Sequence, residues 1–455
     1  MSESVWAGRR LHFVGIGGAG MSGLALVARA LGADVTGSDQ AESTYLQRVR
    51  AAAIDPVVGH AARNVPAGDD VEVVVSTAIA ADNPERVAAR ARGLRERHRG
   101  SLLDEVSRLR RTIAIAGTHG KTTTASMVVH ALRALGWDPS YLIGGELRGP
   151  GSPGRQTNAA LGAGEWLVVE ADESDRSFLE LQPEIAIVTN IELDHHTTYA
   201  SHVELERAFA AFVRESLRVV VADTPGAVAF LDRAGVDEAA FFGASDVVLD
   251  ERGARFRWAE QQVELPVPGA HNVANAAAAL TACAMAGAPP ERLAGTLADF
   301  RGAGRRFERL GETDGGAVVI DDYAHHPTEV RAAIQAARTL GFRRVIVAFQ
   351  PHLFSRTQLL ARDFGAALAL ADAACVLDVY PARERAQDFP EVSGLLVAEA
   401  AADAARGRSV AWAPDFAAAE AVLRASLRDG DLCLVLGAGN IDELGRGLLG
   451  ERTRS

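Results

Sequence analysis

The chain has 455 residues, a formal net charge of −12 and a pI of about 5.5. Hydrophobic residues make up 48% and charged residues 23%, which excludes a disordered chain, and the length predicts about three domains. The acidic balance argues against a nucleic-acid partner, because sequence-independent binding of nucleic acid needs a basic face. No run is long and apolar enough to span a bilayer, and residues 1–10 lack a signal-peptide core, so we expect a cytoplasmic protein without membrane insertion.

Strand–glycine–helix patterns dominate three successive segments, which predicts an α/β protein with three domains at 1–104, 105–302 and 303–455. We expect a Rossmann-like N-terminal domain and a Rossmann-like C-terminal α/β domain. The central domain is expected to have a mostly parallel sheet. Each of the three cysteines lies in an apolar run, which predicts buried thiols in a reducing compartment: Cys283, Cys375 and Cys433.

In the first segment, an apolar strand from Leu11 leads into a glycine-rich loop and a helix, and the next strand, Asp34–Asp39, ends in an aspartate. A third strand is expected at 71–77. The spacing fits a dinucleotide-binding fingerprint made of Gly15, Gly17, Gly18, Gly20 and Asp39. Alone, this pattern indicates a ligand with a diphosphate, and a tight turn that binds nothing is the alternative. The basic run from Arg86 to Arg99 predicts a solvated helix face and a linker.

The second segment contains a stronger phosphate-binding pattern after the predicted strand 112–116. Its residues are Gly117, Thr118, His119, Gly120, Lys121, Thr122 and Thr123. The spacing departs from a strict Walker A loop, because Ile115 stands where that loop has its first glycine. The chemistry is retained, since Lys121 can reach the β and γ phosphates of ATP and the Thr122 hydroxyl can bind Mg²⁺.

Lys121 is the single lysine among 47 basic residues, and all the others are arginines. A compositional bias against lysine would explain the arginines, but it leaves one lysine at the centre of the glycine loop. The planar guanidinium of arginine cannot replace a compact ammonium in such a loop. The position of the lysine therefore favours a phosphate-binding role, and we expect the central domain to be a P-loop-type ATPase.

Two acidic segments follow predicted strands of the same domain. Glu170, Asp172, Glu173 and Asp175 come after the strand 166–169, and their mutual repulsion costs stability unless cations relieve it. A second segment with Glu192, Asp194 and His195 follows the strand 185–189. Because parallel strands end at one edge of a sheet, we expect both segments beside the phosphate loop and predict an Mg²⁺ site there.

Histidines and arginines mark the remaining candidate positions. His271 and Asn272 open an alanine-rich helix, either as an N-cap or as contacts to a nucleotide base. The third segment has strands expected at 317–320, 344–349, 374–379 and 432–436. His325 and His326 follow the first of these strands, and His352 and Arg356 follow the second. Such side chains are typical contacts to carboxylate and phosphate groups, although isolated histidines at turns are more often structural.

Together these motifs resemble the ATP-dependent Mur ligases, in order and spacing over nearly the whole chain, and most closely the branch that adds L-alanine to UDP-N-acetylmuramate. The matching segments are GIGGAGMSG, GTHGKTTT, EADESD, TNIELDHH, HNVANAAAA, FRGAGRRF, DDYAHHPTE, FQPHLFSRT and GAG at 437–439. The resemblance implies that the N-terminal domain binds the UDP part of the sugar nucleotide rather than NAD. It implies ATP and Mg²⁺ in the central domain and amino-acid contacts in the C-terminal domain.

The resemblance also implies a reaction and residue roles. The substrate carboxylate takes the γ-phosphate of ATP to form an acyl phosphate, which the amine of L-alanine then attacks, in the synthesis of peptidoglycan for cell-wall growth, cell shape and division. Lys121, Arg305 and His352 are implied near the reacting groups, Arg306 near ATP, and Glu173 and His326 near the substrate. The Mg²⁺ ligands map to Thr122, Glu170 and His195, the adenine contacts to His271 and Asn272, and the alanine carboxylate to His325 and Arg356.

Two departures from the family pattern stand out. Several sister ligases use a carbamylated lysine to hold a second metal, and this chain has no second lysine for that purpose. Position 197 is threonine where an aspartate is expected.

The alternative functions are a muramic-acid ligase for another amino acid or a recycled peptide, an NAD(P)-dependent oxidoreductase suggested by the first glycine loop, and a non-catalytic ATP-gated binding module. We expect a monomer or a weak homodimer.

Overall fold

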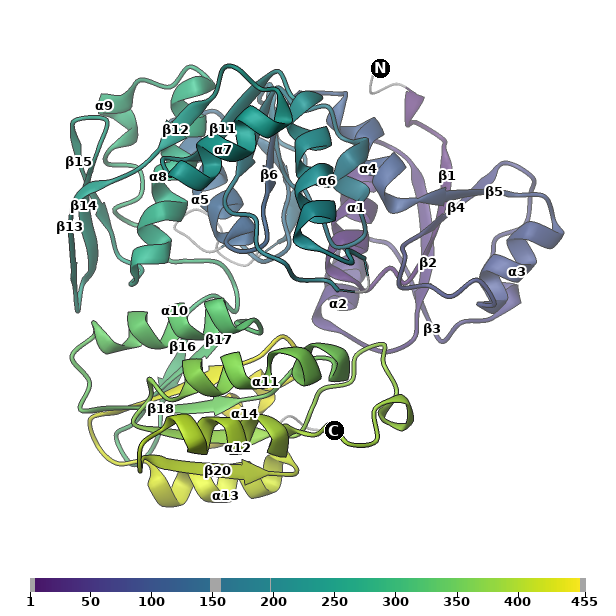
Figure 1. Ribbon diagram of the computed structural model, residues 1–455. Helices are drawn as coiled ribbons and strands as arrows, with labels where there is room; N and C mark the ends of the chain where they lie inside the picture. The colour runs from purple at the N-terminus through teal and green to yellow at the C-terminus, as the bar shows by residue number, and fades with distance from the viewer. Residues whose placement is uncertain (1–4, 148–156, 197, 451–455) are drawn as a thin grey trace. The chain divides into compact units, whose positions relative to one another are not determined.

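The computed structural model describes residues 5–147, 157–196 and 198–450. The chain forms two compact units (Figure 1). The first comprises Met1–Gly243 and Ala274–Leu297, and the second comprises Ala244–Val273 and Ala298–Ser455. The mixed α/β architecture with mostly parallel sheets agrees with the fold class expected from the sequence.

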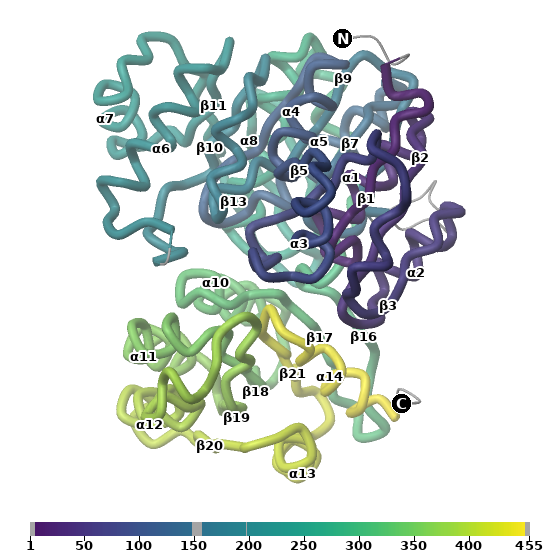
Figure 2. The backbone as a smooth tube through the Cα atoms, turned by 90° about the vertical axis from the view of Figure 1, so that its right-hand side faces the viewer, coloured from purple at the N-terminus to yellow at the C-terminus, as the bar shows by residue number. Residues whose placement is uncertain are grey.

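The first unit contains a five-stranded parallel sheet with the strand order β3-β2-β1-β4-β5. Its strands are β1 (Arg10–Val14), β2 (Asp34–Asp39), β3 (Val57–Val58), β4 (Val71–Val75) and β5 (Arg95–His98). The helices between them are α1 (Ala19–Ala30), α2 (Thr44–Ala51) and α3 (Pro84–Ala91), with a short 3-10 turn at Ala62–Asn64. This is the expected series of strand–helix–strand units, in which β1 pairs with β2 on one side and β4 on the other. Figure 2 labels β1 beside α1 in this part of the chain.

The prediction of a linker within Arg86–Arg99 is wrong. After α3 the chain forms β5, which pairs in parallel with β4. The strand has no apolar pattern, and ion pairs satisfy its charged side chains instead. Arg97 is 8% exposed and bonds to Glu72 at 3.3 Å and to Glu105 at 2.5 Å, and Arg86 pairs with Glu96.

The first unit also contains a seven-stranded sheet with the order β12-β11-β10-β6-β9-β7-β8, parallel except for β8. Its strands are β6 (Arg111–Ala116), β7 (Ser140–Leu142), β8 (Ala159–Ala160), β9 (Trp166–Glu170), β10 (Ile185–Val188), β11 (Arg218–Ala222) and β12 (Ala240–Phe242). Its helices are α4 (Arg99–Ser107), α5 (Lys121–Ala134), α6 (His202–Arg214), α7 (Pro225–Ala234) and α9 (Pro290–Leu293), with a 3-10 turn at Ser177–Glu180. The carboxyl ends of β6, β9 and β10 meet at one edge, as expected from the sequence.

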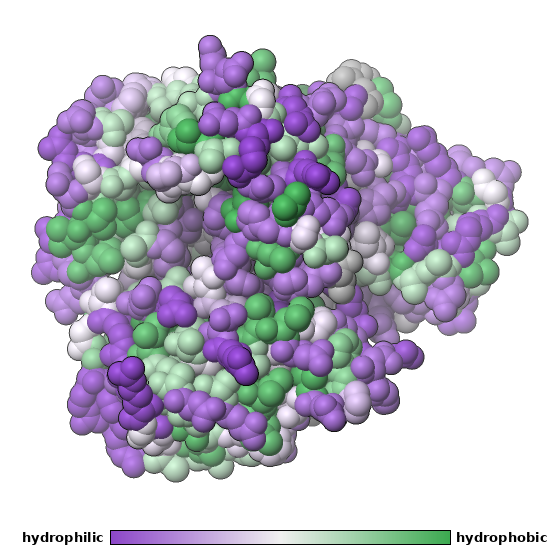
Figure 3. Space-filling model, in the orientation of Figure 1, coloured by the Kyte–Doolittle hydropathy of each residue, from purple (hydrophilic) through white to green (hydrophobic). Residues whose placement is uncertain are grey.

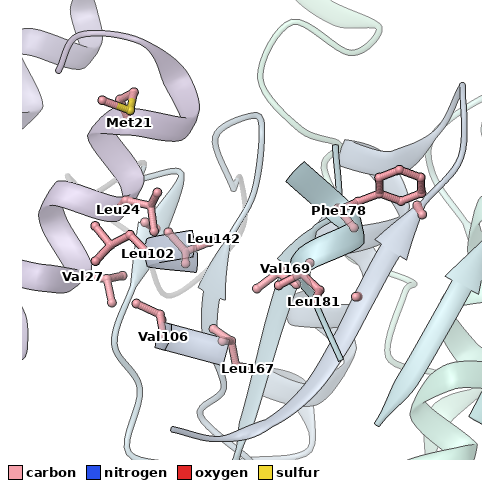
Figure 4. Packing of buried hydrophobic residues seen from close by; sticks show 14 of the residues in the cluster. Met21, Leu24, Val27, Leu102, Val106, Leu142, Leu167, Val169, Phe178 and Leu181 are labelled. Carbon is pink, nitrogen blue, oxygen red and sulfur yellow. The ribbon is translucent and has the colours of Figure 1, made fainter. Parts of the chain in front are cut away.

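The two sheets of the first unit share one hydrophobic core (Figure 4). Met21, Leu24 and Val27 of α1 lie in this core with Leu102 and Val106 of α4. Leu142, Leu167 and Val169 of the central sheet join the same cluster. Each fully buried leucine or valine contributes about 2 kcal/mol, so this packing fixes the first glycine loop relative to the central sheet.

Helix α8 (Ala270–Met285) is the expected alanine-rich helix and runs from one unit into the other. Within the described residues, no helix has both the length and the hydropathy to cross a membrane. The three cysteines are free and buried, as predicted. Burial raises the pKa of the Cys375 thiol to about 11 and that of the Cys433 thiol to about 12.

The second unit is built on a six-stranded sheet with the order β16-β17-β21-β18-β19-β20, parallel except for β16. Its strands are β16 (Glu308–Glu312), β17 (Val318–Asp322), β18 (Arg344–Phe349), β19 (Ala373–Leu377), β20 (Ser409–Ala413) and β21 (Asp431–Leu436). Its helices are α10 (Pro327–Arg338), α11 (Phe354–Leu368), α12 (Gly394–Ala404), α13 (Phe416–Ser426) and α14 (Asp442–Leu448), with a 3-10 turn at Ala386–Asp388. The four strands expected from the sequence are all present, shifted by at most two residues.

A small antiparallel sheet in the second unit has no counterpart in the sequence analysis. It consists of β13 (Ser245–Asp250), β14 (Gly253–Trp258) and β15 (Gln261–Leu265). Val247 and Val248 of β13 are 43% and 48% exposed. Figure 3 shows hydrophobic side chains gathered on the surface where this sheet lies.

Candidate active site

The phosphate loop between β6 and α5 has a backbone that only glycine tolerates at two positions. Gly117 has φ +133° and Gly120, the N-cap of α5, has φ +83°. A β-carbon on Gly117 would lie 2.0 Å from Thr189 Oγ1, and one on Gly120 would lie 2.4 Å from Asn275 Oδ1. The loop therefore leads directly into the N-terminus of α5, whose first N–H groups have no acceptor within the helix, an arrangement that favours bound anions.

The segment after β10 holds the phosphate loop in place through hydrogen bonds. The backbone N–H of His119 donates to Asn190 Oδ1 at 2.9 Å, and Asn190 Nδ2 donates to the carbonyl of His119 at 2.9 Å. Thr189 Oγ1 donates to the same carbonyl at 2.6 Å. Thr189 and Asn190 belong to the matching segment TNIELDHH, but neither was predicted as a site residue. The available signal was their position directly after a buried strand of the parallel sheet.

Lys121 lies folded against its own loop. Its Nζ donates to the carbonyls of Gly117 at 2.6 Å and Thr118 at 3.2 Å, and it lies 2.8 Å from Glu173 Oε2. Burial alone would lower the pKa of Lys121, but Glu173 and the other nearby carboxylates raise it above its ordinary value. Lys121 is therefore an ammonium ion that phosphate oxygens can attract away from the loop carbonyls.

Thr122 and Glu170 provide oxygen ligands beside the lysine. Thr122 Oγ1 donates to Glu170 Oε2 at 2.9 Å, and the backbone N–H of Gly144 donates to the same carboxylate at 2.6 Å. A hydroxyl and a carboxylate are the donor types that Mg²⁺ prefers, so these residues fit that ion. His195, at φ +52°, instead faces Glu173, with 3.5 Å between Nε2 and Oε1. Thr197 lies outside the described residues.

The acidic segment after β9 is neutralised by a cation that the sequence analysis did not identify. Arg99, the first residue of α4, bonds to Asp172 at 2.8 Å and to Asp175 at 2.7 Å. Burial alone would raise the pKa of Asp172, but Arg99 and Lys121 lower it well below its ordinary value. The repulsion expected among the carboxylates is thus relieved by Arg99 and Lys121 together.

The first glycine loop binds an anion of its own chain. The backbone N–H of Gly17 donates to Asp39 Oδ2 at 2.7 Å, and Gly18 is the N-cap of α1. Gly15 has φ +82°, and a β-carbon on Gly20 would lie 2.6 Å from Arg99 Nη1. The loop residues and Asp39 are therefore brought together as predicted, and Arg99 lies against the start of α1.

In the second unit, four side chains gather at the carboxyl ends of β17, β18 and β19. The rings of His325 and His352 lie 5.9 Å apart, and His352 stacks on Tyr380 at 5.8 Å. Arg356 Nη1 lies 3.3 Å from His352 Nδ1, and the arginine is 4% exposed. This group has the cationic and hydrogen-bonding character needed to bind a small carboxylate.

Two other predicted residues of this unit have anchoring contacts. Arg305 donates to Asp321 at 3.0 Å and to the carbonyls of Gly437 and Gly439 at 2.9 and 2.8 Å, so its guanidinium holds the late GAG turn. Burial raises the pKa of Asp321 to about 6, against the opposing effect of Arg305. The guanidinium of Arg306 lies 5.0 Å from the centre of the Tyr323 ring.

The remaining predicted residues lie at helix starts. The His326 side chain accepts from the Thr328 backbone N–H and forms a capping box with Glu329 at the start of α10. Asn272 Nδ2 donates to the carbonyl of Pro268 at 2.8 Å. Burial lowers the pKa of His271 to about 4, so its imidazole is neutral near pH 7. Asn275, on the same helix as His271, lies against Gly120 of the phosphate loop.

Comparison with known proteins agrees with this geometry. Residues 10–111 match the Mur ligase family catalytic domain, residues 115–283 the Mur ligase middle domain, and residues 305–439 the Mur ligase glutamate ligase domain. The chain is 44% identical to UDP-N-acetylmuramate–L-alanine ligase of Streptomyces coelicolor, with 98% of each chain covered. It is 47% identical to the protein of that name from Kineococcus radiotolerans, with 96% of this chain and 94% of that one covered.

Solved structures give the same result. The crystal structure of UDP-N-acetylmuramate–alanine ligase MurC from Thermotoga maritima superposes with a TM-score of 0.82 at 29% identity, covering 97% of this chain and 98% of that one. A murein peptide ligase from Psychrobacter arcticus shares the fold, with a TM-score of 0.72 at 24% identity and coverage of 98% and 100%. The three domain matches, the full-length identity and the superposition establish that this chain belongs to the Mur ligase family.

Proposed function

We propose that this chain is an ATP-dependent ligase that joins L-alanine to the lactyl carboxylate of UDP-N-acetylmuramate, giving ADP and phosphate, in the synthesis of peptidoglycan precursors. The observation that carries the proposal is the Lys121 ammonium in a glycine loop beside the Thr122–Glu170 pair. Full-length relatives at 44–47% identity that carry this enzyme name support it.

The central sheet supplies the phosphoryl-transfer site. The backbone N–H groups of the phosphate loop and the Lys121 ammonium would bind the β and γ phosphates of ATP. Thr122, Glu170 and His195 would hold Mg²⁺, which supplies charge neutralisation when it is bound. The lactyl carboxylate attacks the γ-phosphorus in line, the bond to the bridging oxygen breaks, and ADP leaves with that electron pair.

The second step forms the amide bond. The neutral amine of L-alanine attacks the acyl-phosphate carbon, a proton is lost from nitrogen, and phosphate leaves. His325 and Arg356 would bind the alanine carboxylate, and His352 would lie near the reacting groups, as would Arg305. The positive charges lower the energy of the tetrahedral intermediate, and holding both reactants in place removes the entropy cost of their encounter.

The N-terminal sheet would bind the UDP part of the substrate. Its glycine loop would offer N–H groups to the diphosphate, and Asp39 would accept a hydroxyl hydrogen bond from the ribose.

The domains proposed to bind the three substrates are 1–104 for the sugar nucleotide, 105–302 for ATP and 303–455 for the amino acid. We further propose a cytoplasmic monomer or weak homodimer.

The test is phosphate release from ATP with UDP-N-acetylmuramate and one acceptor at a time: L-alanine, glycine, L-serine, D-glutamate or a tripeptide. Release that requires both the sugar nucleotide and L-alanine is the expected result. Release with D-glutamate or the tripeptide alone would move the enzyme to another ligation step. No release with any acceptor, together with NADH binding detected by fluorescence, would support the oxidoreductase alternative instead.

A further inference from the structure

Arg99 lies between the two glycine loops and touches the acidic segment that faces Lys121. It follows the edge strand β5 of the N-terminal sheet and begins α4, whose Leu102 and Val106 are fixed in the shared core. Its guanidinium is 17% exposed. One side of the guanidinium reaches the start of α1 at Gly20, and the other reaches the loop after β9.

Arg99 binds two carboxylates at once. Nε donates to Asp175 Oδ2 at 2.8 Å, and Nη2 donates to Asp172 Oδ2 at 2.8 Å while lying 2.7 Å from Asp175 Oδ2. Glu173, between these two aspartates, is 1% exposed and points instead to Lys121. Asp172 and Asp175 therefore pair with Arg99, whereas Glu173 pairs with Lys121.

The pairing of the acidic segment with two separate cations matters because more than one carboxylate attracts the Lys121 ammonium. The charges of Glu173, Asp172 and Glu170 all act on its ammonium. Asp172 is likewise acted on by both Arg99 and Lys121. Without Arg99, Asp172 and Asp175 would lose their closest positive charge, and Lys121 would be the nearest replacement. A lysine held more strongly by the acidic segment is less available to the phosphates of a nucleotide.

Arg99 also forms a wall of a cavity of about 140 Å³ in the first unit. Gly20 and Gly23 of α1 line one side, and Gly144 and Glu170 line another. The cavity thus extends from the first glycine loop to the carboxylate proposed to bind Mg²⁺. A guanidinium at the start of α1 faces the positive end of the helix dipole, so its two aspartates are needed to keep it there.

We infer that Arg99 is a positioning residue for ATP binding: by holding Asp172 and Asp175, it leaves the Lys121 ammonium free to move to the nucleotide phosphates. The inference rests on the ATP-binding part of the proposed function. It assigns Arg99 no contact with ATP, so its effect on the nucleotide is transmitted through the acidic segment.

The experiment measures the dissociation constant of MgATP by equilibrium binding, without sugar nucleotide or amino acid. Arg99→Ala is expected to raise it about tenfold, within the range of coupling seen between contacting charged residues. Arg99→Lys should raise it about threefold, because a lysine keeps the charge but cannot bridge two carboxylates in the same way. If Arg99→Ala does not fold, Arg99→Lys alone carries the comparison.

The diagnostic variant removes a carboxylate instead of the cation. In an Asp172→Asn background, Arg99→Ala should weaken ATP binding by about threefold or less, because less negative charge remains to capture Lys121. The asparagine side chain in this background keeps the oxygen that accepts the backbone N–H of Ser174 at 3.0 Å. Equal losses from Arg99→Ala in both backgrounds would overturn the inference, since a purely structural role would give that result.

Arg86→Ala is the matched control. Arg86 is also 17% exposed, and it pairs with Glu96 through two nitrogens at the edge of the same N-terminal sheet. Its loss should leave the MgATP dissociation constant unchanged, and an equal loss of affinity would overturn the assignment to Arg99. These binding results are distinct from the proposed function, because a failed ligation assay with L-alanine would leave the ATP measurements standing.

Discussion

The two glycine loops of the first unit share one plan, a central parallel strand followed by a turn and a helix, but they bind opposite charges of their own chain. The first loop donates the N–H of Gly17 to the carboxylate of Asp39. The second accepts the ammonium of Lys121 on its carbonyls. The same backbone plan therefore binds a carboxylate through an N–H group in one place and an ammonium through carbonyl groups in the other.

A glycine pattern thus identifies a loop, while the charged side chains around it identify its chemistry. Asp39 comes from the neighbouring strand β2 and Lys121 from the loop's own helix. A loop filled by its own carboxylate is suited to hydroxyl recognition next to a diphosphate. A loop with its own ammonium is suited to a triphosphate whose charge changes during the reaction.

Lys121→Arg is expected to have the largest effect, because it replaces the ammonium that distinguishes the second loop from the first. The guanidinium cannot occupy the space of the ammonium among the carbonyls of Gly117 and Thr118, so we expect kcat to fall about 10²–10³-fold with the fold retained. Phosphate release measures the effect and circular dichroism checks the fold. Turnover near that of the wild type would remove the distinction between the loops.

Gly117→Ala tests the steric part of the second loop. A β-carbon there would lie 2.0 Å from Thr189 Oγ1 at φ +133°, so we expect a loss of about 3 kcal/mol in the free energy of unfolding. Gly136→Ala is the control, because φ is +81° there and no atom lies within 4 Å of the added carbon; it should cost about 1 kcal/mol. Equal losses at both positions would contradict the steric argument.

A buried network centred on Glu85 adjoins the first loop through Ser38, and Glu85→Gln tests what that network contributes to stability. Burial alone would raise the pKa of Glu85, but hydrogen bonds from His12, Ser38 and Asn64 lower it from 4.5 to about 2. Because the folded-state pKa is depressed, the stabilisation is present above pH 4.5 and is lost as the pH falls toward 2.

Glu85→Gln should therefore cost about 2 kcal/mol at pH 7 and flatten the acid side of the stability profile. Thermal melts from about pH 7 to about pH 3 measure both effects. Parallel pH profiles for the wild type and the variant would show that Glu85 does not carry this dependence.

Glu170→Ala addresses the metal that only the second loop is proposed to use. Because Glu170 bonds to Thr122 and Gly144, we expect the Mg²⁺ concentration for half-maximal activity to rise about tenfold. Glu165→Ala, directly before the start of the same strand and 66% exposed, should leave the titration unchanged. An unchanged titration for Glu170→Ala would remove this residue from the proposed ligands.

Asp39→Asn gives the smallest expected effect. The amide oxygen can still accept the Gly17 N–H, but the charge is lost, so KM for the sugar nucleotide should rise about threefold while KM for ATP stays constant. Steady-state kinetics with each substrate varied separates the two. A decrease in KM would mean that the carboxylate competes with the substrate diphosphate for the loop.

The sequence predicted the strands best where turns and helices bound them on both sides. β2 and β18 begin and end at the predicted residues, because Asp34–Asp39 and Arg344–Phe349 are bounded by turns and helices on both sides. β5 was missed because its residues, Arg95–His98, are all charged or imidazole-bearing. The burial of Arg97 depends on ion pairs with Glu72, which is 25 positions away, and with Glu105 on the following helix.

The same limit applies to the site. The phosphate loop and its acidic neighbours could be predicted, since they follow strands whose carboxyl ends share one edge. Arg99 could not, because its partners Asp172 and Asp175 are 73 and 76 positions away and the basic run around it resembles a solvated helix. Likewise, no local pattern places Asn275 against Gly120.

The solitary lysine has a practical consequence for chemical labelling. An amine-directed acylating reagent has one side-chain target in the whole chain, Lys121, in addition to the terminal amino group. That target is 12% exposed and engaged by two carbonyls and a carboxylate, so its rate of modification reports how often the ammonium leaves them. The protein thus contains a built-in probe of nucleotide occupancy, readable by intact-mass spectrometry without any introduced tag.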